Sequence, residues 1–288
     1  MGTVQDGQES TTGSQEPHGN QRHVGAGPSY EPAACDTKMT VRVFGTSREM
    51  GAEAAKHTAD ALRSALRDDG VARMIMATGN SQLEFVEALR EHSEVPWGSV
   101  TVFHMDEYIG MASSHPASFA RWLKEKVSDW LQPGTVHYIN GQARDLDAEC
   151  HRYEELLKEA PIALTCMGIG ENGHIAFNEP DATDFNDEHW TRLISLDDAS
   201  RVQQVVEGHF STVAEVPERA ITLTVPALLS ARLVQIVVPG VRKANAVRQA
   251  LHGPVSPSCP ASILRQLANA TLFLDEDSSG QADHKAGR

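Results

Sequence analysis

The sequence predicts an α/β fold in which a mostly parallel β-sheet is covered by helices on both faces. Three observations lead to this prediction. Short apolar runs of strand length recur along the chain. Longer segments with apolar residues at helical spacing separate them. The connections between the two kinds of segment are short, and repeated β–helix–β units of this kind build parallel sheets.

The predicted strands are compact apolar runs, several of them rich in β-branched residues. They lie at residues 40–44, 71–77, 100–105, 162–167, 191–196, 221–224, 233–238 and 270–274. The predicted helices alternate with these strands. They lie at residues 48–68, 82–90, 118–130, 146–159 and 199–207, with two more after Pro226 and Gly240. Gly70 ends the first helix, and Pro116 precedes the third.

Composition bounds the class of protein. The chain has 288 residues, 40% hydrophobic and 22% charged, which suits a soluble globular protein with one large domain or two small ones. No apolar run approaches the roughly 18 residues of a membrane span. The net charge of −14 argues against nucleic acid and against an anionic membrane as partners. Four cysteines without pairing or metal spacing indicate a reducing, cytoplasmic location: Cys35, Cys150, Cys166 and Cys259.

The two ends of the chain differ in composition from the rest. Residues 1–38 are rich in Gly, Ser, Gln, Glu and Pro, and we predict a disordered tail. Residues 278–288 are polar and acidic, and we expect a flexible C-terminal tail. The folded region therefore spans residues 39–277.

The most informative stretch is the polar, glycine-rich loop 168–180, which follows the apolar strand 162–167. Ligands of open α/β sheets bind outside the carboxyl ends of the strands. Asn172, His174 and Glu179 are spaced so that an amide and a carboxylate can both reach one imidazole. Gly-x-Gly and Asn-Gly alone are ordinary turn signals, so the combination carries the prediction of a site.

Three further stretches also follow predicted strands. Thr78-Gly79-Asn80-Ser81 joins a strand to a helix, as anion-binding loops do, although Ser81 also suits a simple helix cap. Asp106 and Glu107 are adjacent carboxylates, so at least one is a candidate acid or base unless the pair is a solvated loop. Arg242 and Lys243 lie in the first turn of a helix, where the helix dipole disfavours cations, so we expect them to face an anion.

Taken together, these motifs resemble the glucosamine-6-phosphate deaminase family, which shares a Rossmann-like fold with the 6-phosphogluconolactonases. Three runs carry the resemblance, at residues 77–81, 103–110 and 173–180, and it extends over about 39–277, which implies a single domain. The lactonases share a Gly-His after the same strand but lack the Asp-Glu-Tyr and Phe-Asn-Glu-Pro patterns. This chain has both.

The resemblance implies a role for each candidate residue. Asp106 would be the base that moves a proton between C2 and C1 of an open-chain sugar. His174 would assist ring opening, with Glu179 and Asn172 as its partners. The phosphate would be held by Lys243 and by the loop residues Thr78, Gly79, Asn80 and Ser81. The reaction implied is isomerisation with loss of ammonia, giving fructose 6-phosphate, without metal or other cofactor.

Several positions depart from the family pattern. Asn172 stands where many members have Asp, so the imidazolium would be stabilised less. The phosphate-contacting Arg expected near Arg201 has no clear match. Arg192 fits the allosteric site of hexameric members, but Ile194 replaces a Lys there, which argues against that regulation. Alternatives are a deaminase or isomerase of another sugar phosphate, a lactonase-like hydrolase and a non-catalytic sensor. A homo-oligomer remains open.

Overall fold

The computed structural model describes residues 37–280. The disordered tail predicted for 1–38 and the flexible tail predicted for 278–288 lie almost entirely outside the described residues. Ser278 is an exception. Its side chain is buried, and its backbone N–H donates to Asp275 Oδ1 at 2.8 Å. Ordered packing therefore continues past Asp277.

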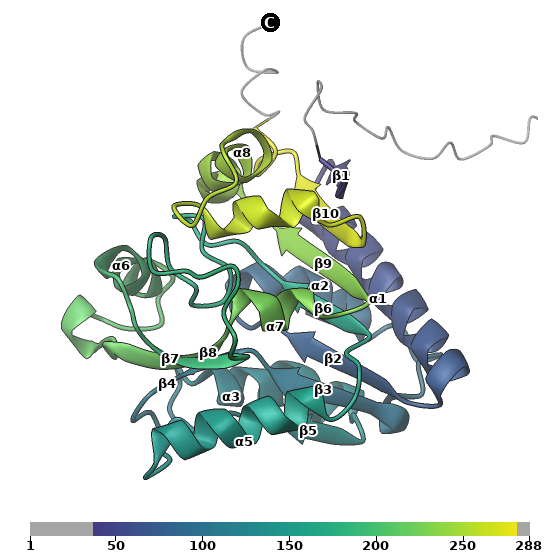
Figure 1. Ribbon diagram of the computed structural model, residues 1–288. Helices are drawn as coiled ribbons and strands as arrows, with labels where there is room; N and C mark the ends of the chain where they lie inside the picture. The colour runs from purple at the N-terminus through teal and green to yellow at the C-terminus, as the bar shows by residue number, and fades with distance from the viewer. Residues whose placement is uncertain (1–36, 281–288) are drawn as a thin grey trace, which may run out of the picture.

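Seven parallel strands form the main sheet, in the order β1-β10-β9-β6-β2-β3-β5 (Figure 1). Their bounds are β1 Thr40–Phe44, β2 Ala72–Met76, β3 Val100–His104, β5 Thr135–His137, β6 Leu164–Met167, β9 Leu233–Val238 and β10 Ala270–Asp275. The predicted α/β fold with a mostly parallel sheet is confirmed. The short edge strand β5 was not predicted.

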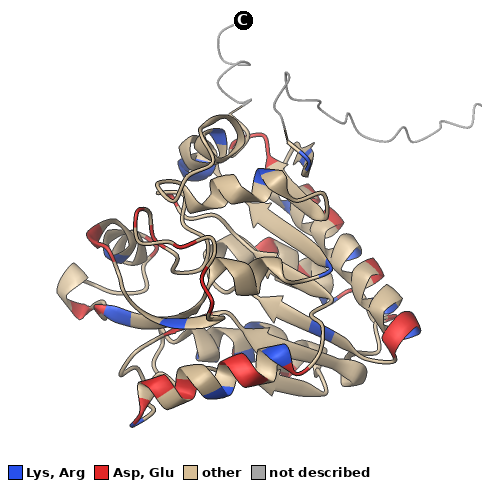
Figure 2. Cartoon of the chain, in the orientation of Figure 1, with Lys and Arg blue, Asp and Glu red and all other residues tan. Residues whose placement is uncertain are grey.

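Helices cover both faces of this sheet. One face carries α1 Ser47–Asp69, α2 Leu83–Leu89, and α3 Phe119–Leu123 with α4 Asp129–Leu131, which a π-helical turn joins. The other carries α5 Leu146–Lys158, α7 Val225–Leu229, α8 Ala244–His252 and the 3₁₀ helix Pro260–Gln266. Charged side chains of both signs lie along α1 and α5, as expected for helices with one face in water (Figure 2).

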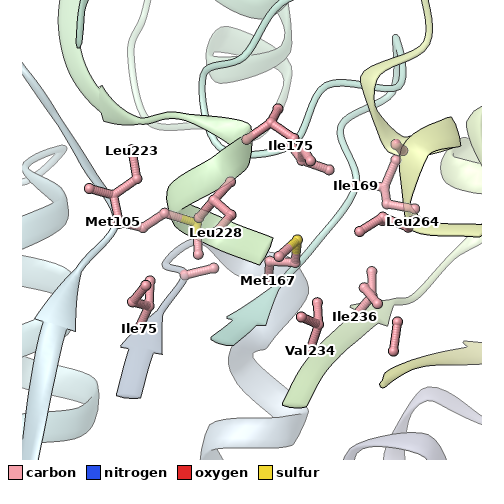
Figure 3. Close-up of a cluster of buried hydrophobic side chains, with 14 of the residues drawn as sticks. Ile75, Met105, Met167, Ile169, Ile175, Leu223, Leu228, Val234, Ile236 and Leu264 are labelled. Carbon is pink, nitrogen blue, oxygen red and sulfur yellow. The ribbon is translucent and has the colours of Figure 1, made fainter. Parts of the chain in front are cut away.

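Side chains alternate between the two cores along each strand. On β9, Val234 and Ile236 enter one hydrophobic cluster, whereas Val237 enters the other. The first of these clusters reaches the carboxyl ends of the strands, where Leu228 of α7 lies beside Met105 and Met167 (Figure 3). Closely packed, buried apolar side chains therefore lie beneath the loops that follow β2, β3 and β6.

A second, three-stranded antiparallel sheet lies beside the first. It consists of β4 Asp106–Tyr108, β8 Arg219–Leu223 and β7 Thr191–Ser195, in the order β4-β8-β7. The alternative of a solvated loop for Asp106 and Glu107 is wrong, because the chain leaves the main sheet at Met105 and pairs with β8, with Asp106 opposite Thr222. Strand β4 is buried throughout.

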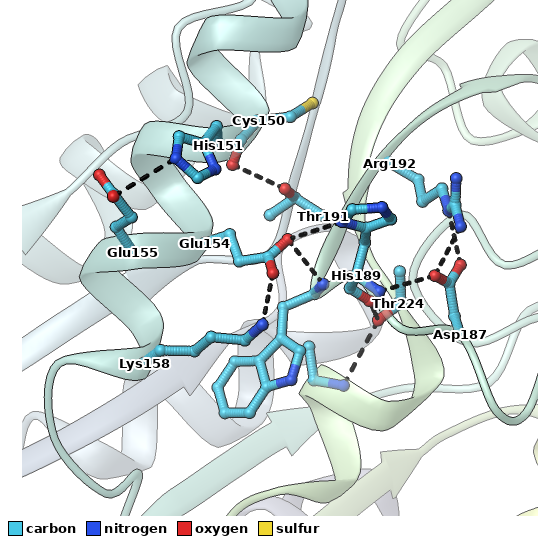
Figure 4. A network of polar contacts seen from close by, with 12 residues as sticks. Cys150, His151, Glu154, Glu155, Lys158, Asp187, His189, Thr191, Arg192 and Thr224 are labelled. Atoms are coloured by element: carbon cyan, nitrogen blue, oxygen red, sulfur yellow. Dashed lines mark hydrogen bonds and ion pairs between the residues drawn. The ribbon is translucent and has the colours of Figure 1, made fainter.

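A polar network fastens the entry to β7 onto α5 (Figure 4). The backbone N–H of Trp190 donates to Glu154 Oε2 at 3.0 Å, and Thr191 Oγ1 donates to the carbonyl of Cys150 at 2.7 Å. His189 Nδ1 lies 3.6 Å from the same Glu154 oxygen. These contacts fix the second sheet against the helix layer of the first.

The strand order places a topological switch point between β2 and β6. From β2 the chain proceeds outward through β3 and β5. From β6 it proceeds the other way, through β9 and β10. The loops that follow β2 and β6 consequently diverge and leave a crevice, which is where α/β sheets bind ligands. The two loops that the sequence analysis singled out, 78–81 and 168–180, begin there.

Candidate active site

A pocket occupies this crevice, at the carboxyl ends of β2, β3, β6 and β9. All but two of the predicted site residues line it: Thr78, Gly79, Asn80, Ser81, Asp106, His174 and Lys243. The other two, Asn172 and Glu179, do not line the pocket but contact His174, Asn172 at the backbone N–H and Glu179 at the imidazole Nδ1. Within residues 37–280, no three His, Cys, Asp or Glu side chains are grouped to hold a metal ion.

The adjacent carboxylates Asp106 and Glu107 have separate surroundings. Glu107 is buried and accepts hydrogen bonds from the Ser118 hydroxyl at 2.7 Å and from the backbone N–H of Ala120 at 2.9 Å. It also accepts from the N–H groups of Tyr108 and Phe119. The donors Ser118, Phe119 and Ala120 stand at the N-terminus of α3, so Glu107 is a structural anchor for that helix.

Asp106 faces the pocket instead. Successive side chains of a strand point to opposite faces, so the fixing of Glu107 in the interior turns Asp106 toward the crevice. Only 7% of Asp106 is exposed. Burial, with a smaller contribution from the charge of Glu107, raises the pKa of Asp106 to about 8. A carboxyl group that titrates so close to neutral pH, in a pocket, can accept and return a proton.

The loop after β6 places His174 against the pocket wall. Gly173 adopts a φ of 90°, which turns the chain just before the histidine. The ring Nδ1 lies 3.5 Å from Glu179 Oε2 and 3.1 Å from the hydroxyl of Ser200. Burial opposes the charge of Glu179, but its contacts with His174, Ser200 and Asn172 prevail and lower its pKa. Glu179 is therefore a carboxylate that can hold the Nδ1 proton and leave Nε2 free.

Asn172 does not reach the imidazole, and in this respect the sequence-based expectation is wrong. Its Oδ1 accepts the backbone N–H of His174 at 3.1 Å, two residues along, which is the geometry of an Asx turn. Its Nδ2 donates to Glu179 Oε2 at 3.0 Å and to Asp197 Oδ2 at 3.2 Å. Asn172 thus bridges two carboxylates and positions the histidine through the backbone.

The loop 78–81 presents polar groups to the other end of the pocket. Gly79 has a φ of 100°, and the chain enters a 3₁₀ turn, Asn80–Gln82, before α2. No side chain caps this turn, and Ser81 Oγ instead accepts from Gln82 Nε2 at 3.1 Å. The alternative that Ser81 is only a helix cap is therefore wrong.

The two basic residues after β9 separate. Lys243 is buried and lines the pocket, whereas Arg242 is half exposed and lies 3.4 Å from Glu171 Oε1. Burial lowers the pKa of Lys243, although the carboxylates of Glu207 and Glu171 oppose this effect. Of these two side chains, only Lys243 therefore stays a candidate to face an anion in the pocket.

Helix α6, Asp198–Val206, and the turn after it contribute residues that sequence reasoning missed. Ser200 contacts His174, and the pocket is also lined by Gln203, Gln204, Glu207 and His209. The Gln204 side chain is buried, and its Oε1 has no hydrogen-bond partner in the described part of the chain. Amides, a carboxylate and a histidine in a helical segment equally suit a solvated face, so nothing in the pattern marked them.

The structure also shows the surroundings of Arg201 and Arg192, which the sequence analysis considered when it compared this chain with the family pattern. Arg201 donates to the carbonyls of Val213 and Val216 and does not line the pocket. Arg192 is bonded to both oxygens of Asp187, at 2.6 and 2.7 Å (Figure 4). Its guanidinium is therefore already paired within the chain.

Comparisons with known proteins agree with one another. Residues 45–273 match the family model described as glucosamine-6-phosphate isomerases/6-phosphogluconolactonase. A glucosamine-6-phosphate deaminase of Bacillus cytotoxicus is 33% identical over 75% of this chain and 80% of its own length. One of Bacillus cereus is 36% identical over 70% of this chain and 75% of its own.

Solved structures show the same likeness. A monomeric glucosamine-6-phosphate deaminase superimposes with a TM-score of 0.77 at 29% identity, over 84% of this chain and 99% of that one. A 6-phosphogluconolactonase from Shewanella baltica superimposes with a TM-score of 0.69 at 19% identity, over 84% of this chain and 100% of that one, which shows a shared fold. None of the helices in residues 37–280 has the length and apolar character needed to span a membrane.

Proposed function

The chain belongs to the glucosamine-6-phosphate isomerase/6-phosphogluconolactonase family, and we propose that it is a glucosamine-6-phosphate deaminase. It would convert glucosamine 6-phosphate and water to fructose 6-phosphate and ammonia. The observation that carries this proposal is the placement of Asp106, with its raised pKa, in one pocket with His174 and the loop 78–81.

The first step is opening of the sugar ring. Glu179 holds the Nδ1 side of His174, so Nε2 can relay a proton at the ring oxygen and release the aldehyde at C1. Ser200 adds a second contact on Nδ1 at 3.1 Å. The imidazole ring of His174 is thus held in one orientation by Glu179, from the loop after β6, and by Ser200, from α6.

The second step is proton transfer along the open chain. Asp106 as a carboxylate removes the proton from C2 and returns it to C1, while a proton passes from the nitrogen on C2 to the aldehyde oxygen, so that the C1 carbonyl becomes a hydroxyl group and C2 becomes an imine. Water then adds to the imine carbon, the carbon–nitrogen bond breaks, and ammonia leaves the ketose. A base whose pKa lies near the working pH suits both the removal and the return of the proton.

Binding energy comes from the phosphate, which is remote from the reacting carbons. We propose that the backbone and hydroxyl groups of Thr78, Gly79 and Ser81 hold it, with Asn80 in the same loop, and that Lys243 supplies positive charge. No step of this reaction calls for a metal or nicotinamide.

The test is ammonia release from purified protein given glucosamine 6-phosphate, with fructose 6-phosphate measured in parallel. Asp106→Asn should abolish both products. Asp60→Asn, which changes an exposed carboxylate on α1, is the matched control and should leave them unchanged. If the protein turned over 6-phosphogluconolactone or another amino sugar phosphate and left glucosamine 6-phosphate unchanged, that compound would replace glucosamine 6-phosphate as the proposed substrate. Tight sugar-phosphate binding without any turnover would indicate a sensor.

We also propose that the reaction takes place in the cytoplasm without nucleic acid or membrane. Its substrate and product are sugar phosphates, and the net charge of −14 repels other polyanions. Cell fractionation tests the location. Light scattering of the purified protein determines whether it forms a homo-oligomer.

A further inference from the structure

The anion end of the pocket contains a histidine–carboxylate pair beside the buried lysine. His209 follows α6, and its Nε2 lies 3.6 Å from Glu207 Oε2. Both side chains line the pocket together with Lys243 and the loop 78–81. Their side chains are only 18% and 12% exposed, so solvent screens their charges little.

Glu207 is held in place as an anion. Gln203 Nε2 donates to its Oε1 at 2.8 Å, and Asn80 Nδ2 donates to its backbone carbonyl at 3.3 Å. Burial opposes ionisation of Glu207, but the contact with His209 and the charge of Lys243 outweigh it and lower the pKa of this carboxyl. A carboxylate therefore stands at the end of the pocket where a phosphate is to bind.

The charges at this end decide what it can bind. With His209 neutral, Lys243 and Glu207 cancel, and Arg242 compensates Glu171 nearby. A phosphate dianion brought to a site without net charge would exchange its hydration only for the neutral hydrogen-bond donors of the loop 78–81. A proton on His209 would provide the missing positive charge and would offset the negative charge of Glu207, 3.6 Å away.

We propose that His209 binds the substrate's phosphate as a cation, stabilised by Glu207, so that anion binding at this site takes up a proton. This inference deepens the proposed function and rests on it for the identity of the ligand. It assigns to His209 a positioning and specificity role at the phosphate, whereas the reacting carbons lie with Asp106 and His174. It also accounts for a carboxylate at an anion site.

Sulfate is the probe that tests this, because it remains a dianion from pH 5 to 9 and its own titration cannot contribute. Imidazoles change charge between about pH 5 and 8. We expect sulfate affinity, measured by calorimetry, to fall about tenfold from pH 6 to pH 8, which is the loss of one charged hydrogen bond. Asp106, His174, Glu207 and Lys243 also line this pocket. The titrations are therefore repeated in the Asp106→Asn background, which removes the carboxyl group that titrates near pH 8.

Two variants of the same residue should behave in opposite ways. His209→Gln should bind sulfate weakly and with less than twofold change over this pH range. His209→Arg, with a permanent charge, should bind sulfate at pH 8 as tightly as the unmodified protein does at pH 6. His151→Gln, at a 75% exposed side chain on α5, is the control and should reproduce the unmodified profile. A His209→Gln protein that keeps the unmodified pH dependence would overturn the proposal, and so would a His209→Arg protein without tighter binding at pH 8.

Proton uptake provides an independent readout. Calorimetry of sulfate binding at pH 7.5, in two buffers of different ionisation enthalpy, should show uptake of a proton that is absent in His209→Gln. Sulfate binding requires no turnover, so it separates this inference from the proposed reaction. If sulfate binding depends on pH and takes up a proton but no ammonia is released, the role proposed for His209 stands and the deaminase assignment is overturned. Ammonia release together with sulfate binding that does not depend on pH would support the deaminase assignment and overturn the role proposed for His209.

Discussion

The imidazole of His174 occupies the space that a side chain on Gly170 would need. A Cβ at position 170 would lie 2.3 Å from Nε2 and from Cε1 of the ring. Both residues belong to the loop after β6, and the carbonyl of His174 accepts the N–H of Gly170 at 2.9 Å. The glycine is therefore required by the position of the histidine.

Gly170→Ala should displace the imidazole and lower kcat at least tenfold, because a shift of about 1 Å in a catalytic group is costly. The fold should persist, since the loop lies outside the sheet. Ammonia release and circular dichroism measure the two effects. Gly98→Ala is the control, because a Cβ there has no neighbour within 4 Å. Equal activity in the two variants would contradict the packing described.

Ser200→Ala should lower kcat about fivefold and leave KM nearly unchanged, because one hydrogen bond to His174 is lost and none of the groups proposed to hold the phosphate is altered. Steady-state kinetics separates the two constants. Ser211→Ala, at an exposed position after α6, is the matched control. A rise in KM with constant kcat would show that Ser200 acts on binding instead.

Asn172→Asp should destabilise the protein most at high pH. The new carboxylate would take the place of the amide that lies 3.0 Å from Glu179 and 3.2 Å from Asp197. Three carboxylates together raise one another's pKa in the folded state above the unfolded value, so stability is lost as pH rises. Thermal unfolding should show a deficit in Tm at pH 8 that shrinks toward pH 5. A deficit independent of pH would rule out charge repulsion as the cause.

Asp106→Asn should be more stable than the unmodified protein above neutral pH, although inactive. The folded pKa of about 8 exceeds the ordinary value of 3.8, so the folded state binds a proton that the unfolded state releases. Stability from this group is complete below about pH 4 and is lost as pH rises toward 8. We expect Tm to be about 3 °C or more higher in the variant at pH 8 and similar at pH 4. Asp60→Asn should show no such divergence.

The same carboxyl group should shape the pH–rate profile. As a base Asp106 must be ionised, so kcat/KM should rise with pH up to an apparent pKa near 8 in the free enzyme. The acidic limb measured with glucosamine 6-phosphate checks this. A limb centred near pH 4 would mean that another group is the base, or that Asp106 is better solvated than its burial implies.

Most of the main sheet could be predicted because its inner strands β2, β3, β6, β9 and β10 are short, mostly apolar runs that are almost entirely buried. Strands β7 and β8 were also predicted, but their separate sheet was not, since β4 is only three residues long and polar, and its partner β8 lies more than a hundred residues further on. For the same reason the local pattern could not distinguish Asp106 from Glu107, and only the family resemblance selected Asp106. Neighbouring side chains of a strand must diverge, but the pairing with β8 decides which one faces the pocket.

The candidate site shows the same division. Thr78, His174 and Lys243 follow strands of the main sheet, so their convergence could be inferred from topology. Ser200, Glu207 and His209 come from a helix and a turn whose docking depends on single polar contacts, such as Asp197 with Asn172. The local sequence pattern does not predict contacts between residues so far apart in the chain.

The pairing of β1 with β10 has a consequence for how the chain folds. Thr40 lies opposite Thr271, so among residues 37–280 the first strand has the last one as its only neighbour in the sheet. On a ribosome, β1 emerges early and must wait for nearly the whole chain before its backbone can be paired. Until then the edge of β9 is also open, which favours association between nascent chains. Contacts of such long sequence separation make folding slow, and this protein should therefore benefit from chaperones that shield unpaired strands.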